Sequence, residues 1–295
     1  MKAARAVRLA AIALFVGTIG FGAVSAFFAY RFTTPARRAL AVAPEKFLGA
    51  HEVVRFPARD GVMLAGWFVP RADTTKAVVL LHGYGTTRTQ MLARARFFHD
   101  QGFAALLYDA RGHGESADAL VSFGLFEKQD LLGALDWLRG RGFTELGCVG
   151  ASQGGATIAL ASAELGGIRW AVLESVYPTL LNAVDRRFRR TLLLPGWLAG
   201  CAMIPIAEWR LGASAGSISP RDGISALSCP VLIMAGEQDT HTLPLDAREV
   251  FDHAREPKSW WLVPGAAHAD LYGHAKQSYE ATVFRFISEI PAPAK

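Results

Sequence analysis

Cysteine, charge and lysine are all scarce in this chain. Its 295 residues include three cysteines, Cys148, Cys201 and Cys229, an odd number whose spacing fits neither a disulfide framework nor a metal site. Cys148 and Cys229 lie in or beside expected core strands, where a buried free thiol is the ordinary role. Charged residues make up 19% of the chain, below the usual share of about 25%. We therefore expect no metal and no structural disulfide.

The basic residues are mostly arginine. Of 31 basic residues 24 are Arg and 7 are Lys, and the formal net charge is +5. No stripe of basic residues alternates with aromatic ones, so we do not expect nucleic-acid binding. Apolar residues make up 51% of the chain, enough for a large core, and the length is normal for one α/β domain.

The first apolar run is long enough to cross a membrane. Residues 9–30 contain no charge, and about 20 apolar residues span a bilayer. Val24-Ser25-Ala26 resembles a signal-peptide cleavage site, but the apolar run continues through Phe27-Phe28-Ala29-Tyr30. We therefore expect residues 1–32 to be a single-pass anchor, with a cleaved signal peptide and a secreted or periplasmic product as the alternative. Three basic residues flank the run closely on each side. The amino terminus itself slightly favours an internal N-terminus, with the rest of the chain outside the cytoplasm.

Strand and helix patterns alternate after a linker at residues 33–50. Asp60-Gly61 separates the first two strand patterns and predicts an antiparallel hairpin. The later strands are continuous apolar runs, as in strands buried on both faces. The expected strands are 51–56, 63–69, 77–82, 103–108, 146–150, 170–174, 231–235 and 260–263, and helices are expected at 87–101, 126–139, after 152, at 245–254 and at 274–289. This alternation predicts an α/β fold with a mostly parallel central sheet and helices on both faces.

One segment, at about residues 176–228, interrupts the alternation. It holds four arginines, followed by an uncharged run at 191–207. Pro195, Gly196, Gly200 and Pro205 break that run, which argues against a second membrane crossing. The arginines are Arg186, Arg187, Arg189 and Arg190. They fit either anionic lipid headgroups or a solvated helix face.

The pattern Gly150-Ala151-Ser152-Gln153-Gly154 lies between an apolar strand and a helical pattern. Gly-x-Ser-x-Gly in this context is the nucleophile elbow. The two glycines leave room for a sharp turn that holds Ser152 in a strained conformation and exposes its Oγ at the edge of the sheet.

With this elbow, and with His82-Gly83-Tyr84-Gly85 before it, the chain resembles the α/β-hydrolases that use a serine nucleophile, over roughly residues 53–290. It is similar in particular to serine-aminopeptidase-like and esterase-like members. The resemblance implies an α/β-hydrolase fold in which residues 51–295 form the domain. It also implies that the insertion at 176–228 is a short helical cap over the active site, and that no cofactor is needed.

The order of catalytic residues in this fold is Ser, acid, His. Ser152, Asp239 and His268 follow that order, and the last two come directly after expected strands. Parallel strands bring such positions to one edge of the sheet. The competitors are Glu174 and Asp270 for the acid, and His241, His253 and His274 for the base.

The resemblance implies two backbone N–H donors for an oxyanion, those of Gln153 and Tyr84. The Tyr84 side chain is expected either to touch substrate or to pack. The stretch from Asp109 to Ser116 is expected to be structural, with Asp109 paired to Arg111 and no catalytic role for His113.

Three functions remain open. The first is a membrane-anchored serine hydrolase that cleaves lipid-like acyl esters or thioesters, with the apolar part of the cap either lining an acyl pocket or packing on the core. The second is a serine-aminopeptidase-like peptidase, for which Glu174 and Glu208 are candidate ligands of a substrate amine. The third is a non-catalytic binding module, which the complete set of Ser, Asp and His disfavours.

Overall fold

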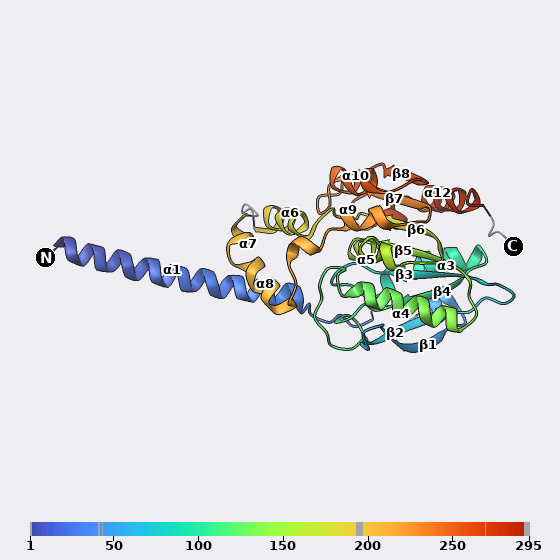
Figure 1. Cartoon of the computed structure of the whole chain (residues 1–295), viewed down its shortest axis with the longest axis horizontal. Helices are drawn as coiled ribbons and strands as arrows, with labels where there is room; N and C mark the ends of the chain where they lie inside the picture. The colour runs from blue at the N-terminus through green and yellow to red at the C-terminus, as the bar shows by residue number, and fades with distance from the viewer. Residues whose placement is uncertain (1, 41, 43, 193–196, 269, 292–295) are drawn as a thin grey trace.

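The computed structural model describes residues 2–40, 42, 44–192, 197–268 and 270–291 (Figure 1). Its centre is an eight-stranded sheet with the order β1-β2-β4-β3-β5-β6-β7-β8. The strands are β1 (Glu52–Pro57), β2 (Met63–Val69), β3 (Lys76–Leu81), β4 (Ala104–Tyr108), β5 (Glu145–Ala151), β6 (Ile168–Glu174), β7 (Val231–Gly236) and β8 (Lys258–Val263).

Strand β2 runs antiparallel to both of its neighbours, β1 and β4, and the other neighbouring strands are parallel. The hairpin predicted around Asp60-Gly61 is therefore confirmed, and so is the mostly parallel sheet. The central strands are apolar along their length because both faces of the sheet are covered. In β3, for example, residues 77–81 are all buried.

Helices cover the two faces of the sheet as expected. One face packs against α4 (Glu127–Gly140), α5 (Gln153–Ala161) and α10 (Pro244–His253). The other face packs against α3 (Leu92–Asp100), α11 (Leu271–His274) and α12 (Lys276–Ser288). The segment expected to be a linker contains a short helix, α2 (Glu45–Leu48), whose Leu48 is buried in this second layer.

A group of short helices lies between β6 and β7, where the cap is expected. It consists of α6 (Leu180–Leu192), α7 (Trp197–Cys201), α8 (Met203–Leu211) and α9 (Pro220–Gly223). Part of the uncharged run, residues 193–196, falls outside the described residues. In Figure 1, α6, α7 and α8 lie around the base of the N-terminal helix, whereas α9 lies beside α5 and α10.

The N-terminal helix α1 (Lys2–Thr33) is continuous and projects away from the domain (Figure 1). It is long and apolar enough to cross a membrane, and its described apolar side chains up to Val24 are almost all exposed. Its last two turns pack on the cap, where Ala29 is fully buried beside Phe188 and Met203. The helix therefore becomes part of the folded domain before it ends.

Candidate active site

The turn from β5 into α5 is as sharp as the elbow pattern predicts. Ser152 has φ 51° and ψ −110°, in the region that L-residues rarely adopt. A Cβ on Gly150 would lie 2.3 Å from the carbonyl carbon of Gly154, and a Cβ on Gly154 would lie 2.4 Å from the carbonyl oxygen of Leu81. Glycine at both positions is what permits this turn, and the turn presents the Ser152 side chain at the carboxyl edge of the sheet.

The structure brings Ser152, Asp239 and His268 together. Nε2 of His268 lies 3.1 Å from Oγ of Ser152, and Nδ1 of His268 lies 2.7 Å from Oδ2 of Asp239. Ser152 follows β5, Asp239 follows β7 and His268 follows β8, so the carboxyl ends of three parallel strands, at one edge of the sheet, position all three. A proton on Nδ1 of His268 is donated to Asp239, and Nε2 then accepts from the Ser152 hydroxyl.

Asp239 is buried and suited to remain ionised. Burial by itself raises the pKa of this carboxyl group, but its hydrogen bond to His268 and the nearby imidazole charge, together with the backbone N–H groups of Thr242 and His241, bring the pKa below its usual range. The ring of His241 stacks on His268 with centroids 4.8 Å apart. The carboxylate thus fixes the orientation of His268.

The competing acids have other partners or positions. Glu174 is fully buried and accepts hydrogen bonds from Nε of Arg94, at 2.7 Å, and from the hydroxyl of Tyr279, at 2.6 Å. Asp270 is exposed at the start of α11. Of the described carboxylates, Asp239 is the one that His268 contacts.

The loop at residues 83–85 lies directly over the elbow. A Cβ on Gly83 would lie 3.6 Å from Cβ of Ser152. Within the described part of the chain, the backbone N–H groups of Tyr84 and Gln153 have no hydrogen-bond acceptor. Gln90, which the sequence did not single out, holds the loop by accepting from the N–H of Gly83 at 2.8 Å.

Two histidines support this loop from behind. His82 donates from Nδ1 to the carbonyl of Gly83 at 2.7 Å, and its Nε2 accepts from the N–H of Ala110 at 3.0 Å. His113 contacts the carbonyl of Arg111 through Nδ1 and accepts from the N–H of Gly85 at Nε2, at 3.0 Å. Both roles require the neutral imidazole. His113 is therefore a support of the loop, in keeping with the structural role expected of its segment.

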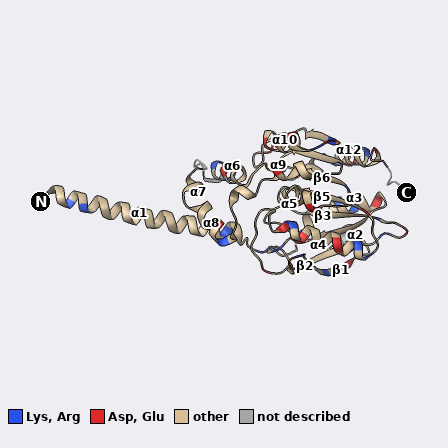
Figure 2. Cartoon of the chain, viewed as in Figure 1, with Lys and Arg blue, Asp and Glu red and all other residues tan. Residues whose placement is uncertain are grey.

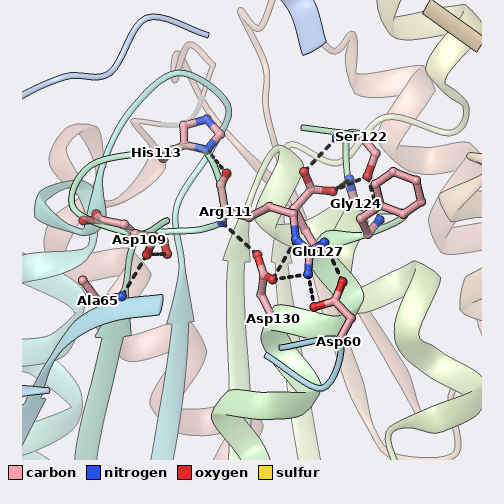
Figure 3. A network of polar contacts seen from close by, with 11 residues as sticks. Asp60, Ala65, Asp109, Arg111, His113, Ser122, Gly124, Glu127 and Asp130 are labelled. Carbon is pink, nitrogen blue, oxygen red and sulfur yellow. Dashed lines mark hydrogen bonds and ion pairs between the residues drawn. The ribbon is translucent and has the colours of Figure 1, made fainter. Parts of the chain in front are cut away.

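The pairing expected between Asp109 and Arg111 is wrong. Figure 3 shows Arg111 held by Asp60 and Asp130, and its Nη2 lies 2.8 Å and 2.7 Å from their carboxylate oxygens. Asp109 instead pairs with the buried Arg88, with Nη1 3.0 Å from Oδ2. Neighbouring positions in a turn point in different directions, so the two residues found partners in other parts of the fold.

The Tyr84 side chain connects this loop to the N-terminal helix. Its hydroxyl donates to the carbonyls of Arg31 and Phe32, at 3.0 Å and 3.2 Å. Its ring stacks on Phe123 with centroids 4.9 Å apart. Burial raises the pKa of Tyr84 to about 12, so the hydroxyl is protonated and acts as a donor. The side chain was expected either to touch substrate or to pack, and these contacts are packing contacts.

A cleft of about 310 Å³ opens above Ser152. One end of α1 contributes Phe32, and the cap contributes Leu180, Ala183 and Val184. Its polar lining includes Arg38, Arg187 and Arg190 with His241 and Thr242. Among these, Arg38 and Phe32 are residues whose place in the site the sequence did not indicate. His241, a competitor for the base, lines the cleft and stacks on His268. The cleft therefore combines an apolar wall with positive charge beside the Ser–His pair.

Known proteins resemble the chain in both sequence and fold. The family model described as serine aminopeptidase, S33, matches residues 72–177. The uncharacterized protein YqkD of Bacillus subtilis is 27% identical over 244 residues, which cover 79% of this chain and 78% of YqkD. The esterase Pf2001 of Pyrococcus furiosus superposes with a TM-score of 0.75 at 22% identity, over 89% of this chain and all of the esterase. Together with the strand order and the elbow, these matches show that the chain has the α/β-hydrolase fold.

Proposed function

We propose that this protein is a serine hydrolase that cleaves carboxylic esters through an acyl-enzyme. The observation that carries the proposal is the pair of contacts made by His268, 3.1 Å to Oγ of Ser152 and 2.7 Å to Asp239. A serine hydroxyl is a weak nucleophile until a base accepts its proton, and the base needs a carboxylate that holds it in one tautomer. The strained turn at Ser152 adds support, because such strain concentrates at functional positions.

Each step has a residue to perform it. Oγ of Ser152 attacks the ester carbonyl and transfers its proton to Nε2 of His268. The oxyanion that forms accepts hydrogen bonds from the N–H groups of Tyr84 and Gln153. His268 then gives its proton to the leaving alkoxide, and the alcohol departs. Water hydrolyses the acyl-enzyme by the same steps in reverse, which releases the acid and restores the Ser152 hydroxyl.

The lining of the cleft favours an ester over an aminopeptidase substrate. A free substrate amine requires an acidic partner, but no Asp or Glu is among the described residues that line the cleft. Glu174 is engaged by Arg94 and Tyr279. Glu208 accepts hydrogen bonds from the Ser214 hydroxyl and a neighbouring N–H. Because both glutamates are engaged by other groups, neither is available to bind a substrate amine. The peptidase is therefore the second candidate, and its support is the matched family model.

We propose further that α1 is a retained anchor. The apolar helix continues without a break past Ala26 into the turns that pack on the cap, so the apolar run does not end where a signal peptide would be cleaved. The uncharged run from residue 9 to residue 30 is about 33 Å long as a helix, which matches a hydrocarbon core of about 30 Å. Trp197 and Trp209 in the cap are 66% and 82% exposed. Exposed tryptophans beside a spanning helix are typical of the membrane interface.

Hydrolysis of p-nitrophenyl esters from acetate to palmitate by the full chain in detergent tests the activity. We expect turnover that Ser152→Ala reduces to background and that Ser162→Ala, a substitution just past the C-terminal end of α5, leaves intact. An aminoacyl p-nitroanilide serves as the peptidase arm. Turnover of the anilide alone would replace the ester hydrolase with the peptidase, and a folded protein inactive on both classes would refute the proposal.

A further inference from the structure

Three arginines line the cleft that contains Ser152 and His268. Arg187 and Arg190 come from α6, and Arg38 comes from the segment that follows α1. Positive charge thus converges on the cleft from two separate parts of the chain, and Figure 2 shows the basic residues on α6 and around the base of α1. No carboxylate is among the lining residues that the structure describes.

These three arginines differ from the arginines next to them in sequence, which have carboxylate partners. The neighbouring pairs are Arg37 with Asp118, Arg186 with Asp246 and Arg189 with Asp185. Over residues 2–40, 42, 44–192, 197–268 and 270–291, no ion pair involves Arg38, Arg187 or Arg190. Their charge is available to a ligand in the cleft.

The charge of two of these arginines acts on His241, the neighbour of His268. Burial, followed by the charges of His268, Arg190 and Arg187, lowers the pKa of His241 to about 4. His241 stacks on His268, and its Nδ1 lies 3.4 Å from Nη1 of Arg190. Since clefts with low-dielectric walls focus such a field, an anion gains more from this position than it would on an open surface.

A second, apolar groove of about 330 Å³ joins the cleft. The two share five lining residues, Phe32, Arg38, Tyr84, Gly85 and Arg187. The groove is walled by further aromatic residues at the end of α1 and on α6, namely Phe27, Phe28 and Phe188. Phe27 is 59% exposed, on the helix that is long enough to cross a membrane. The groove beside α1 and the cleft at Ser152 therefore lie side by side, with Arg38 and Arg187 bordering both.

We propose, resting on the ester-hydrolase function, that the substrate is a membrane phospholipid with a net negative headgroup. Its phosphate binds Arg38, Arg187 and Arg190, one acyl chain lies in the groove of Phe27, Phe28 and Phe188, and the ester carbonyl lies at Ser152. One guanidinium group can donate two parallel hydrogen bonds to a phosphate, which a lysine ammonium cannot do. A cluster of arginines is therefore well suited to bind a phosphate group. Water is consumed, one acyl ester bond is cleaved, and a fatty acid and a lysophospholipid are released.

The test compares an anionic with a zwitterionic lipid, each supplied once in a membrane and once in water-soluble form. The full chain is reconstituted into vesicles of dioleoyl phosphatidylglycerol or dioleoyl phosphatidylcholine, and fatty-acid release is measured. The dibutyroyl forms of the same two lipids are the water-soluble arm, and p-nitrophenyl butyrate is the uncharged reference. The variants are R38A/R187A/R190A and Arg187→Glu, and the matched control is Arg189→Ala on the same helix.

We expect the wild type to prefer phosphatidylglycerol to phosphatidylcholine by about tenfold or more in kcat/KM, which corresponds to about 1.4 kcal/mol. The triple variant and Arg187→Glu should abolish this preference, and Arg189→Ala should keep it. Equal rates on the two lipids, or turnover of p-nitrophenyl butyrate alone, would overturn the inference and leave the ester hydrolase standing. If only the water-soluble anionic lipid is hydrolysed, the substrate is a free anionic ester and not a membrane lipid. Inactivity on every ester would refute both proposals.

Discussion

The two neutral histidines behind the loop at 83–85 make the fold sensitive to acid. His82 accepts a hydrogen bond from Ala110 and His113 accepts one from Gly85, each at Nε2. Protonation would place a donor against a donor at both positions. Burial, with the charge of the nearby His113, lowers the pKa of His82 to about 4, and burial also lowers the pKa of His113.

The sign of the effect follows from the unfolded chain, in which histidine has a pKa of about 6.5. Between pH 6.5 and pH 4 the unfolded chain binds a proton that folded His82 does not bind. The free energy of unfolding therefore falls as the pH falls through this range, by about 1.4 kcal/mol per pH unit and about 3 kcal/mol in all for His82. His113 adds a contribution of the same sign.

Denaturant unfolding of the full chain in detergent at pH 7.5 and pH 5.0 measures this loss. His82→Gln keeps one donor and one acceptor but does not titrate, so we expect it to reduce the difference between the two pH values by about 2 kcal/mol. The exposed His253→Gln is the control and should leave the difference unchanged. An unchanged pH dependence in His82→Gln would refute the claim that His82 must stay neutral.

Three further substitutions probe the site. Asp239→Asn should lower kcat on p-nitrophenyl butyrate by about 10³–10⁴-fold because His268 loses the carboxylate that fixes its tautomer; near wild-type turnover would assign the acid elsewhere. Glu174→Gln should cost about 3–5 kcal/mol in denaturant unfolding, because it leaves the charge of Arg94 buried without a carboxylate partner; an unchanged midpoint would contradict that role. Tyr84→Phe should cost about 1 kcal/mol, since two carbonyls at the end of α1 lose their donor; thermal unfolding would detect this, and no change would show that the hydroxyl is dispensable.

Short sequence patterns were sufficient to predict much of the fold and the turn at Ser152. Gly150 and Gly154 are required because a Cβ at either position would clash with backbone nearby, in the elbow itself or on the adjacent strand. The five-residue pattern is therefore enough to predict the turn. The alternating strands and helices likewise gave the sheet, because an apolar run buried on both faces has few other uses. The proximity of Asp239 and His268 followed from the common direction of β7 and β8.

The parts that could not be predicted depend on tertiary packing. Nothing local to Asp109 and Arg111 indicates that their partners are Arg88 and the pair Asp60 and Asp130. The end of α1 could not be assigned to the active site, because Phe32 reaches the cleft only through the way the helix packs on the cap. Arg38 lies in a segment expected to be a linker, and its charge meets those of α6 only in three dimensions.

The measurement that tests the central claim most directly is labelling of the full chain with a fluorophosphonate, followed by mass spectrometry to locate the adduct. An activated serine reacts with this reagent far faster than an ordinary hydroxyl does. The account predicts one adduct, on Ser152, that is lost in Ser152→Ala and strongly slowed in His268→Ala. A folded wild-type protein that stays unlabelled, or one labelled at another serine, would contradict it.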